Sequence, residues 1–209
     1  MIMACTISAE EIKRVKGLGF LNNKGTDLFN GRVITVNGKI TAAQVKEAYD
    51  SHWADGAHEH MVQPKMVYIS HPTELGTLYT KQELTDLRKI CDECGLYLFL
   101  DGARLAYGLA AEGTDVTLSD IAALTDAFYI GGTKVGALFG ECVVISQPAL
   151  KEDFRYLIKQ KGGMLAKGRL LGLQFLAMFE NDLYMEMGRH ADRLAMKLKK
   201  ELQEKGYRF

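Results

Sequence analysis

Short apolar runs alternate with amphipathic segments through the middle of the chain. The apolar runs are predicted strands, and they cover residues 66–70, 96–101, 127–130 and 140–146. The segments between them follow the spacing of a helix, over residues 84–94, 103–111 and 118–124. Strands that are apolar throughout and alternate with helices are typical of sheets covered on both faces, so the pattern predicts an α/β fold.

The last two predicted strands break this regularity. Ile130 and Cys142 are separated by too few residues for a crossover helix. Because parallel neighbours need such a crossover, we expect one of these two strands to run antiparallel to its neighbour.

The two ends of the chain have different patterns. Near the N-terminus we expect one or two helical turns at 10–15, a strand at 31–36 and a helix at 41–49 with Thr41 as its N-cap. After Pro148 the pattern is helical almost throughout, over residues 150–161, 166–180 and 183–204. We interpret this part as a connecting helix that leads into a second, smaller domain.

Composition narrows the class of protein. The chain has 209 residues with 26 basic and 26 acidic side chains and no basic block, which argues against a nucleic-acid binder. It has no run of 18 apolar residues, and its first residues lack the apolar core of a signal peptide. We therefore expect no membrane partner and a cytoplasmic location.

Cysteine and histidine residues offer two possible metal sites. Cys91 and Cys94 form a Cys-x-x-Cys, but both lie on the apolar face of the helix at 84–94, which favours small core residues over zinc ligands. His52, His58 and His60 lie in a polar stretch that we interpret as a surface loop, since no carboxylate or cysteine framework accompanies them.

Ionisable groups follow two of the predicted strands. Asp101 ends the strand at 96–101, and Lys134 comes after two glycines that end the strand at 127–130. Ligands of open α/β sheets bind at the carboxyl ends of strands. A carboxylate that holds a ring nitrogen protonated and a lysine that forms a Schiff base are the groups that pyridoxal 5′-phosphate (PLP) requires. On spacing alone, a structural ion pair between Asp101 and Arg104 is an equally good interpretation.

Three motifs surround these strand ends: residues 68–79 (Tyr-Ile-Ser-His-Pro-Thr-Glu-Leu-Gly-Thr-Leu-Tyr), 99–106 (Phe-Leu-Asp-Gly-Ala-Arg-Leu-Ala) and 128–141 (Phe-Tyr-Ile-Gly-Gly-Thr-Lys-Val-Gly-Ala-Leu-Phe-Gly-Glu). They resemble the threonine aldolase family, which belongs to the aromatic amino-acid β-eliminating lyases among the fold-type-I PLP enzymes. The resemblance implies the three-layer αβα fold of aspartate aminotransferase. It implies an atypical N-terminal segment at 1–36, a partial PLP-binding large domain at 37–148, and a connecting helix with the start of the small domain at 149–209.

The resemblance also implies roles for individual residues. Lys134 is the Schiff-base lysine, Asp101 pairs with the pyridine nitrogen, and Arg104 binds the substrate carboxylate, for which a planar bidentate donor is suited. Thr133 is placed near the cofactor, at its phosphate. Arg169 is a second candidate for substrate binding.

Some of these assignments have alternatives. Lys161 and Lys167 lie in the same basic segment as Arg169, and a solvated helix face explains all three equally well. His71 follows a predicted strand and is a candidate for a cofactor contact.

The implied reaction is the cleavage of a β-hydroxy-α-amino acid, with threonine giving glycine and acetaldehyde, by a homodimer or homotetramer. Members of the family also carry a glycine-rich phosphate loop, a histidine stacked on the ring and a second arginine, none of which is recognisable here. The sequence is therefore expected to be an internal piece of such an enzyme. A catalytically incomplete fragment, or a related β-eliminating lyase, is the alternative.

Overall fold

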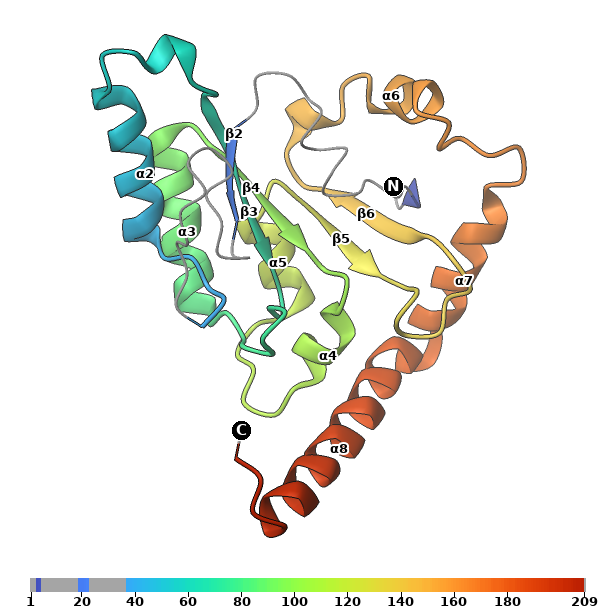
Figure 1. Cartoon of the computed structure of the whole chain (residues 1–209). Helices are drawn as coiled ribbons and strands as arrows, with labels where there is room; N and C mark the ends of the chain where they lie inside the picture. The colour runs from blue at the N-terminus through green and yellow to red at the C-terminus, as the bar shows by residue number, and fades with distance from the viewer. Residues whose placement is uncertain (1–2, 5–18, 23–36, 209) are drawn as a thin grey trace.

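The computed structural model describes residues 3–4, 19–22 and 37–208. Within these residues a six-stranded sheet has the order β1-β6-β5-β4-β3-β2 (Figure 1). The strands are β1 (Met3–Ala4), β2 (Gly19–Asn22), β3 (Pro64–Ser70), β4 (Tyr97–Asp101), β5 (Ala127–Gly131) and β6 (Glu141–Ile145). Strands β2, β3, β4 and β5 run parallel to one another, whereas β6 runs antiparallel to β5 and β1 antiparallel to β6. The predicted antiparallel pair is thus confirmed.

Helices connect the parallel strands and make up the C-terminal part. They are α2 (Ala42–Ala54), η1 (His58–His60), α3 (Lys81–Cys94), α4 (Leu105–Ala110), α5 (Leu118–Leu124), η2 (Pro148–Leu150), α6 (Phe154–Gln160), α7 (Arg169–Phe179), η3 (Glu180–Asp182) and α8 (Leu183–Glu204). Threonines 41, 80 and 117 begin α2, α3 and α5, each with a capping box that satisfies the exposed backbone amides of the first turn. Every helix predicted after residue 37 is present. The strand and helical turns predicted at 31–36 and 10–15 lie outside the described residues.

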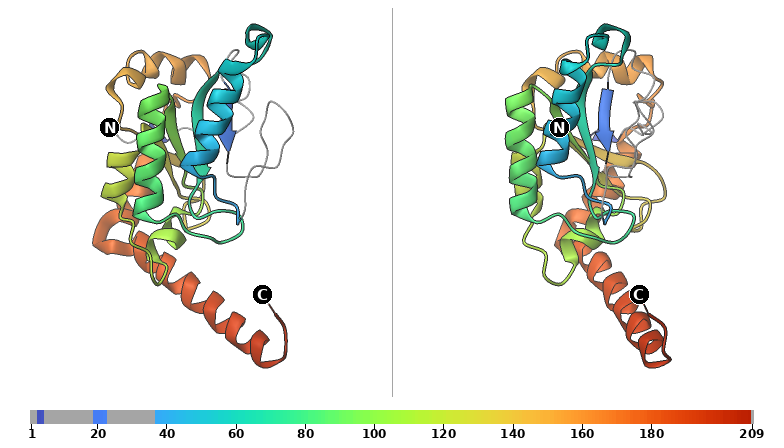
Figure 2. Two further views of the ribbon diagram at one scale, coloured as in Figure 1. Left: turned by 90° about the vertical axis from the view of Figure 1, so that its left-hand side faces the viewer. Right: turned by 60° about the vertical axis from the view of Figure 1, so that its left-hand side comes forward.

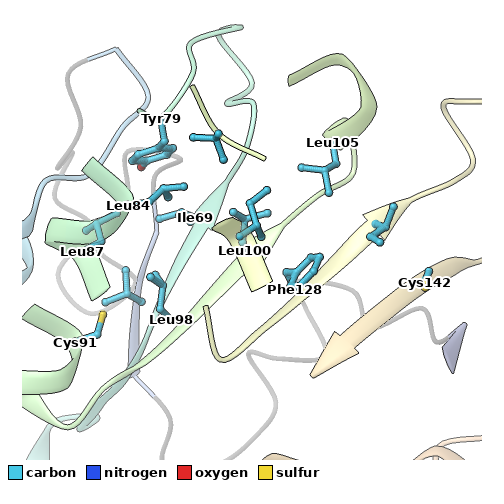
Figure 3. Close-up of a cluster of buried hydrophobic side chains, with 14 of the residues drawn as sticks. Ile69, Tyr79, Leu84, Leu87, Cys91, Leu98, Leu100, Leu105, Phe128 and Cys142 are labelled. Atoms are coloured by element: carbon cyan, nitrogen blue, oxygen red, sulfur yellow. The ribbon is translucent and has the colours of Figure 1, made fainter. Parts of the chain in front are cut away.

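The main core lies between the sheet and the helices α2, α3 and α5. One face of α3 is buried over its whole length, through Leu84, Leu87, Ile90, Cys91 and Cys94. These side chains pack with Leu98 and Leu100 of β4 in one apolar cluster (Figure 3). Both cysteines are free thiols, and burial raises the pKa of Cys91 to about 12. The interpretation of Cys91 and Cys94 as core residues is confirmed.

Aromatic side chains line the opposite face of the sheet. Phe99 of β4 stacks on Tyr68 of β3 with ring centroids 5.5 Å apart, and Tyr129 of β5 lies 6.3 Å from Phe99. Successive side chains of a strand point to opposite faces, so Phe99 and Asp101 share this face while Leu98 and Leu100 face the helices.

Helix α8 packs on α4 and then runs away from the sheet (Figures 1 and 2). Contact is close because Gly188 has no side chain: a Cβ there would lie 2.5 Å from the carbonyl oxygen of Ala106. Between α7 and α8 the backbone turns at Asn181 and Asp182, which both have positive φ. The division into domains at residues 36/37 and 148/149 stays a prediction.

The structure corrects the interpretation of His52. Helix α2 extends to Ala54 rather than ending near residue 49, and His52 is 6% exposed. Val45 and His52 are seven residues apart and therefore share the buried face of the helix. The His52 ring packs edge-on against Trp53, at 5.0 Å, and burial lowers its pKa. Within the described part of the chain, no group of three or more histidine, cysteine or acidic residues is arranged to hold a metal ion.

Among the described residues, no helix is both long and apolar enough to cross a membrane.

Candidate functional site

Asp101 is the last residue of β4 and lies at the carboxyl end of the parallel strands. It is 8% exposed, and three groups donate hydrogen bonds to its carboxylate. The Tyr129 hydroxyl and the Ala103 amide, at 3.0 Å, donate to Oδ1, and the Tyr68 hydroxyl donates to Oδ2. A buried carboxylate is costly unless it is hydrogen-bonded, and these three donors supply the compensation.

The hydroxyl groups of Tyr68 and Tyr129 remain protonated at neutral pH. Burial raises the pKa of both hydroxyls, and the nearby Asp101 carboxylate raises each pKa further. Both tyrosines therefore act as hydrogen-bond donors to the Asp101 carboxylate.

Two glycines bring the end of β4 against the end of β5. A Cβ on Gly102 would lie 1.9 Å from the carbonyl oxygen of Tyr129, and a Cβ on Gly131 would lie 2.5 Å from that of Ala103. The Gly131 amide donates to the Gly102 carbonyl at 2.9 Å. Neither close approach is possible with a larger residue, so these glycines set the separation of the two loops.

Lys134 lies in the turn that follows β5. Backbone bonds from Val135 and Ala137 to the Gly132 carbonyl, at 2.9 and 3.0 Å, close this turn. The Tyr107 hydroxyl of α4 donates to the carbonyl oxygen of Lys134. The Lys134 side chain is exposed, and no hydrogen bond or ion pair holds its ammonium group among the residues that the structure describes.

Glu141, the first residue of β6, reaches back to the same turn. Its carboxylate accepts hydrogen bonds from the Gly132 amide, at 2.7 Å, and from the Thr133 hydroxyl, at 3.1 Å. Burial raises the pKa of Glu141, while these two bonds and the nearby Lys134 lower it. Thr133, predicted at the phosphate of a cofactor, thus has a hydrogen-bond partner within the protein.

Arg104 is half-buried at the N-cap of α4, two residues beyond the close contact at Gly102. It lines a hollow of about 260 Å³ together with Thr73, Tyr107 and Asp192. The structure records no ion pair between Arg104 and Asp101 within the described residues, so the interpretation of these two as a structural ion pair is not supported. The lining of this hollow also includes Glu74, and it includes neither Asp101 nor Lys134.

Arg169 is the first residue of α7 and is exposed. Its helix docks on the loop beyond Lys134 through Gln174, which accepts from the Leu138 amide at 2.7 Å and donates to the Phe139 carbonyl at 3.1 Å. Arg169 thus lies on an element that contacts the lysine loop, whereas the exposed face on which it lies is also compatible with solvation alone.

His71 does not face an open crevice. Its side chain is fully buried, its Nδ1 accepts from the Tyr79 amide at 3.3 Å, and its Nε2 has no partner among the described residues. Its backbone amide donates to the Asp101 carbonyl at 3.0 Å. His71 therefore supports the backbone of the site rather than contributing its imidazole.

Four site residues were not singled out from the sequence: Tyr68, Tyr107, Tyr129 and Glu141. The strand register contains a signal for one of them. Phe99 pairs with Ala127, so Asp101 comes opposite Tyr129 and on the same face. Pairing the predicted strands in parallel would have found this contact, but Glu141 and Tyr107 approach through turns that carry no such periodicity.

The site therefore joins three kinds of group at one end of the sheet. A carboxylate fixed as an acceptor and a half-buried guanidinium come from the end of β4 and the segment after it, and an exposed primary amine comes from the turn after β5. Such a set can bind a ligand that carries a protonated nitrogen, a carbonyl group and an anionic group.

Comparisons with known proteins identify the family and the fold of the chain. The sequence profile of the beta-eliminating lyase family matches residues 6–208. A low specificity L-threonine aldolase of Pseudomonas aeruginosa is 32% identical over 162 residues, which are 76% of this chain and 44% of that protein. A second, from a Pseudomonas species, is 31% identical over 183 residues, or 86% of this chain and 50% of that protein. The chain thus spans about half the length of these curated relatives.

Solved structures extend the comparison to the fold. The threonine aldolase of Leishmania major is 44% identical, with a TM-score of 0.82 over 92% of this chain and 59% of that one. A PLP-bound C-S lyase of Staphylococcus hominis, 16% identical with a TM-score of 0.54 over 81% of this chain and 43% of that one, shares the fold alone. These matches confirm the predicted α/β fold of the fold-type-I PLP enzymes. With the profile match over residues 6–208, they show that the chain belongs to the beta-eliminating lyase family.

Proposed function

We propose that this protein binds PLP at Lys134 and cleaves β-hydroxy-α-amino acids, with threonine giving glycine and acetaldehyde. The observation that carries the proposal is the junction of two strand ends. Asp101 and the turn of Lys134 are tied together by the bond from the Gly131 amide to the Gly102 carbonyl at 2.9 Å. The threonine aldolases that resemble the chain at 31% to 44% identity support the choice of reaction.

The hydrogen-bonding capacity of Asp101 fits a pyridine ring. A carboxylate has about four acceptor sites. Tyr129 and Ala103 take two of them at Oδ1 and Tyr68 takes one at Oδ2, which leaves room for one more donor at Oδ2. A protonated ring nitrogen is such a donor, and Asp101 would keep the proton on it by charge and by hydrogen bonding.

Lys134 fits the other requirement of the cofactor. Its amine is exposed and has no hydrogen bond or ion pair to the rest of the described chain, so no existing interaction has to be broken before it reacts with an aldehyde. The turn around it is nevertheless fixed, through Tyr107 and Glu141. A fixed backbone with a free side chain suits covalent attachment.

The remaining residues would hold the substrate and the phosphate. Arg104 would bind the substrate carboxylate with its planar guanidinium. The hollow of about 260 Å³ beside Arg104 is lined by neither Asp101 nor Lys134, so it is not taken as the substrate site. Arg169 would add a second positive charge from the start of α7, and Thr133 would contact the phosphate with its hydroxyl. For Thr133 this role requires its hydroxyl to be shared with, or released from, Glu141.

The cofactor would supply an electron-accepting ring that stabilises the charge left on Cα when the Cα–Cβ bond breaks. The chain's own contribution is then to orient the amino acid through Arg104 and to keep the ring nitrogen protonated through Asp101. We further propose that the protein works in the cytoplasm. We also propose that it forms a homodimer or homotetramer, which light scattering of the purified protein would test.

The reaction is tested by product analysis. Purified protein supplied with PLP and L-threonine should release glycine and acetaldehyde in equal amounts, and Lys134→Ala should abolish both. A protein that carries PLP on Lys134 but releases no acetaldehyde would contradict the proposed substrate.

A β-elimination on the same site is the second candidate, because the matched family is described by that chemistry. Serine and aromatic amino acids offered in parallel would separate the two. Elimination from serine gives pyruvate and ammonia, whereas aldol cleavage of threonine gives glycine and acetaldehyde.

A further inference from the structure

The turn that carries Lys134 is held from one side by a single carboxylate. Glu141 lies directly opposite Gly131 in the antiparallel pairing of β5 and β6. From there its side chain accepts one hydrogen bond from each of the two residues that precede Lys134, at 2.7 Å from Gly132 and 3.1 Å from Thr133. The sheet pairing fixes the backbone of Glu141, and the two hydrogen bonds hold its carboxylate against the turn.

Gly132 depends on this acceptor. The residue is buried, and a Cβ on it would lie 2.8 Å from the Phe175 ring and 2.9 Å from Ala137. Its carbonyl oxygen already accepts from Val135 and Ala137. A buried amide without a partner is costly, so Glu141 is what permits the backbone to take this path toward Lys134.

Glu141 is also close to the charged groups of the site. It is half-buried, burial raises its pKa, and the neighbouring Asp101 raises it further. The Lys134 ammonium is the cation that acts on Glu141 in the opposite direction, which links the carboxylate to the proposed reactive group.

We propose that Glu141 is a positioning residue that, through its two accepted hydrogen bonds, holds the Lys134 turn in the conformation in which the amine takes up PLP. This inference rests on the proposed function of Lys134. It gives Glu141 no contact with the substrate or the cofactor, and it assigns the effect to the geometry of residues 132–134.

The test measures how fast PLP labels Lys134 in the folded chain. Brief exposure to PLP, followed by borohydride, converts the lysine linkage to a stable secondary amine, and peptide mass spectrometry then reports the labelled fraction. The exposed Lys151 serves as an internal reference, because it lies in a different part of the chain from the turn. A general loss of structure changes the labelling of both lysines, whereas a change of the turn alters their ratio.

Three variants separate the possible causes. Glu141→Ala removes both hydrogen bonds and should lower the ratio of Lys134 to Lys151 labelling by about ten-fold or more. Glu141→Gln keeps an acceptor for Gly132 and a partner for Thr133, and should stay within about three-fold of the original ratio. Glu59→Ala removes an exposed carboxylate in η1 and is the matched control. It should leave the labelling ratio unchanged.

Two results would overturn the positioning role. One is a labelling ratio in Glu141→Ala equal to that of the original protein, and the other is a ratio in Glu141→Gln as low as that of Glu141→Ala. If Glu141→Ala does not fold, Glu141→Met replaces it, since it keeps the length of the side chain but accepts neither hydrogen bond, and it should lower the ratio by a similar factor. An original protein that is never labelled at Lys134 would instead refute the proposed function on which the inference rests.

Discussion

The amide of Gly131 donates to the carbonyl oxygen of Gly102 at 2.9 Å, and a Cβ on either glycine would collide with the other loop. This one bond fixes the distance between the last residue of β5 and the residue after β4. Asp101 precedes the first glycine of the pair and Lys134 follows the second by three residues. The relative placement of the two proposed cofactor groups is therefore a property of the backbone.

Replacing Gly102 should damage the fold. In Gly102→Ala the new Cβ would lie 1.9 Å from the Tyr129 carbonyl, which is backbone and cannot rotate away. We expect a loss of about 2–4 kcal/mol in the free energy of unfolding, measured by urea denaturation. Gly172→Ala is the matched control, because nothing lies within 4 Å of its Cβ. In the middle of α7 it should stabilise the protein by about 0.5–1 kcal/mol.

Neutralising Asp101 should weaken cofactor binding without unfolding the protein. In Asp101→Asn the amide can still pair with the two tyrosine hydroxyls, each of which can accept as well as donate. The charge that keeps a ring nitrogen protonated is lost, so the dissociation constant for PLP should rise about ten-fold or more. Titration followed by fluorescence measures this. Asp86→Asn, whose side chain is about half exposed on α3, should bind as the original does. Equal affinity of Asp101→Asn and the original protein would argue against the role of Asp101.

Acid should destabilise the protein through His71. Burial lowers the pKa of His71 from 6.5 to about 4, so the folded state resists protonation more than the unfolded state does. The stability that the protein has with His71 neutral is therefore fully present above pH 6.5. It is lost as the pH falls from 6.5 toward 4, by about 3 kcal/mol of the free energy of unfolding in all. Urea denaturation at pH 7 and pH 4 should show a drop that is smaller by about this amount in His71→Met, which has no titrating ring. Identical pH dependence in the two proteins would be inconsistent with a buried neutral His71.

Asp126 should be important for stability even though it lies away from the site. It is 8% exposed, and its Oδ2 accepts from Arg88 Nη1 and from the Leu98 amide, both at 2.7 Å. Asp126→Ala leaves both donors unpaired and should lower the free energy of unfolding by about 3 kcal/mol. Asp50→Ala breaks the exposed ion pair with Lys46 and should change it by less than about 0.5 kcal/mol. Comparable urea midpoints for the two variants would refute this ranking.

Local patterns predicted most of the architecture. The boundaries of α5 match residue for residue, and the buried face of α3 is the predicted one, because the period of a helix and the alternation of strands are properties of neighbouring residues. The end of α2 was misjudged: its polar composition resembles a loop, and the burial of His52 depends on a tertiary contact.

The candidate site was predictable only in part. Asp101 ends a strand, and Arg104 and Lys134 each lie three residues beyond one, so the rule that ligands bind at strand ends points to this region. The contacts of Glu141 and Tyr107 depend on how the loops fold back toward Lys134. Such contacts join residues that are distant in sequence, and no periodicity encodes them.

The attachment of PLP to Lys134 is tested most directly by reduction with borohydride and peptide mapping of the full chain. We expect one peptide, residues 128–141 or the fragment that contains Lys134, with the mass of reduced PLP added at near-stoichiometric occupancy. Lys134→Ala should lose this adduct while keeping its folded circular dichroism spectrum. PLP distributed evenly over the exposed lysines, with the same total in Lys134→Ala, would refute the proposed attachment.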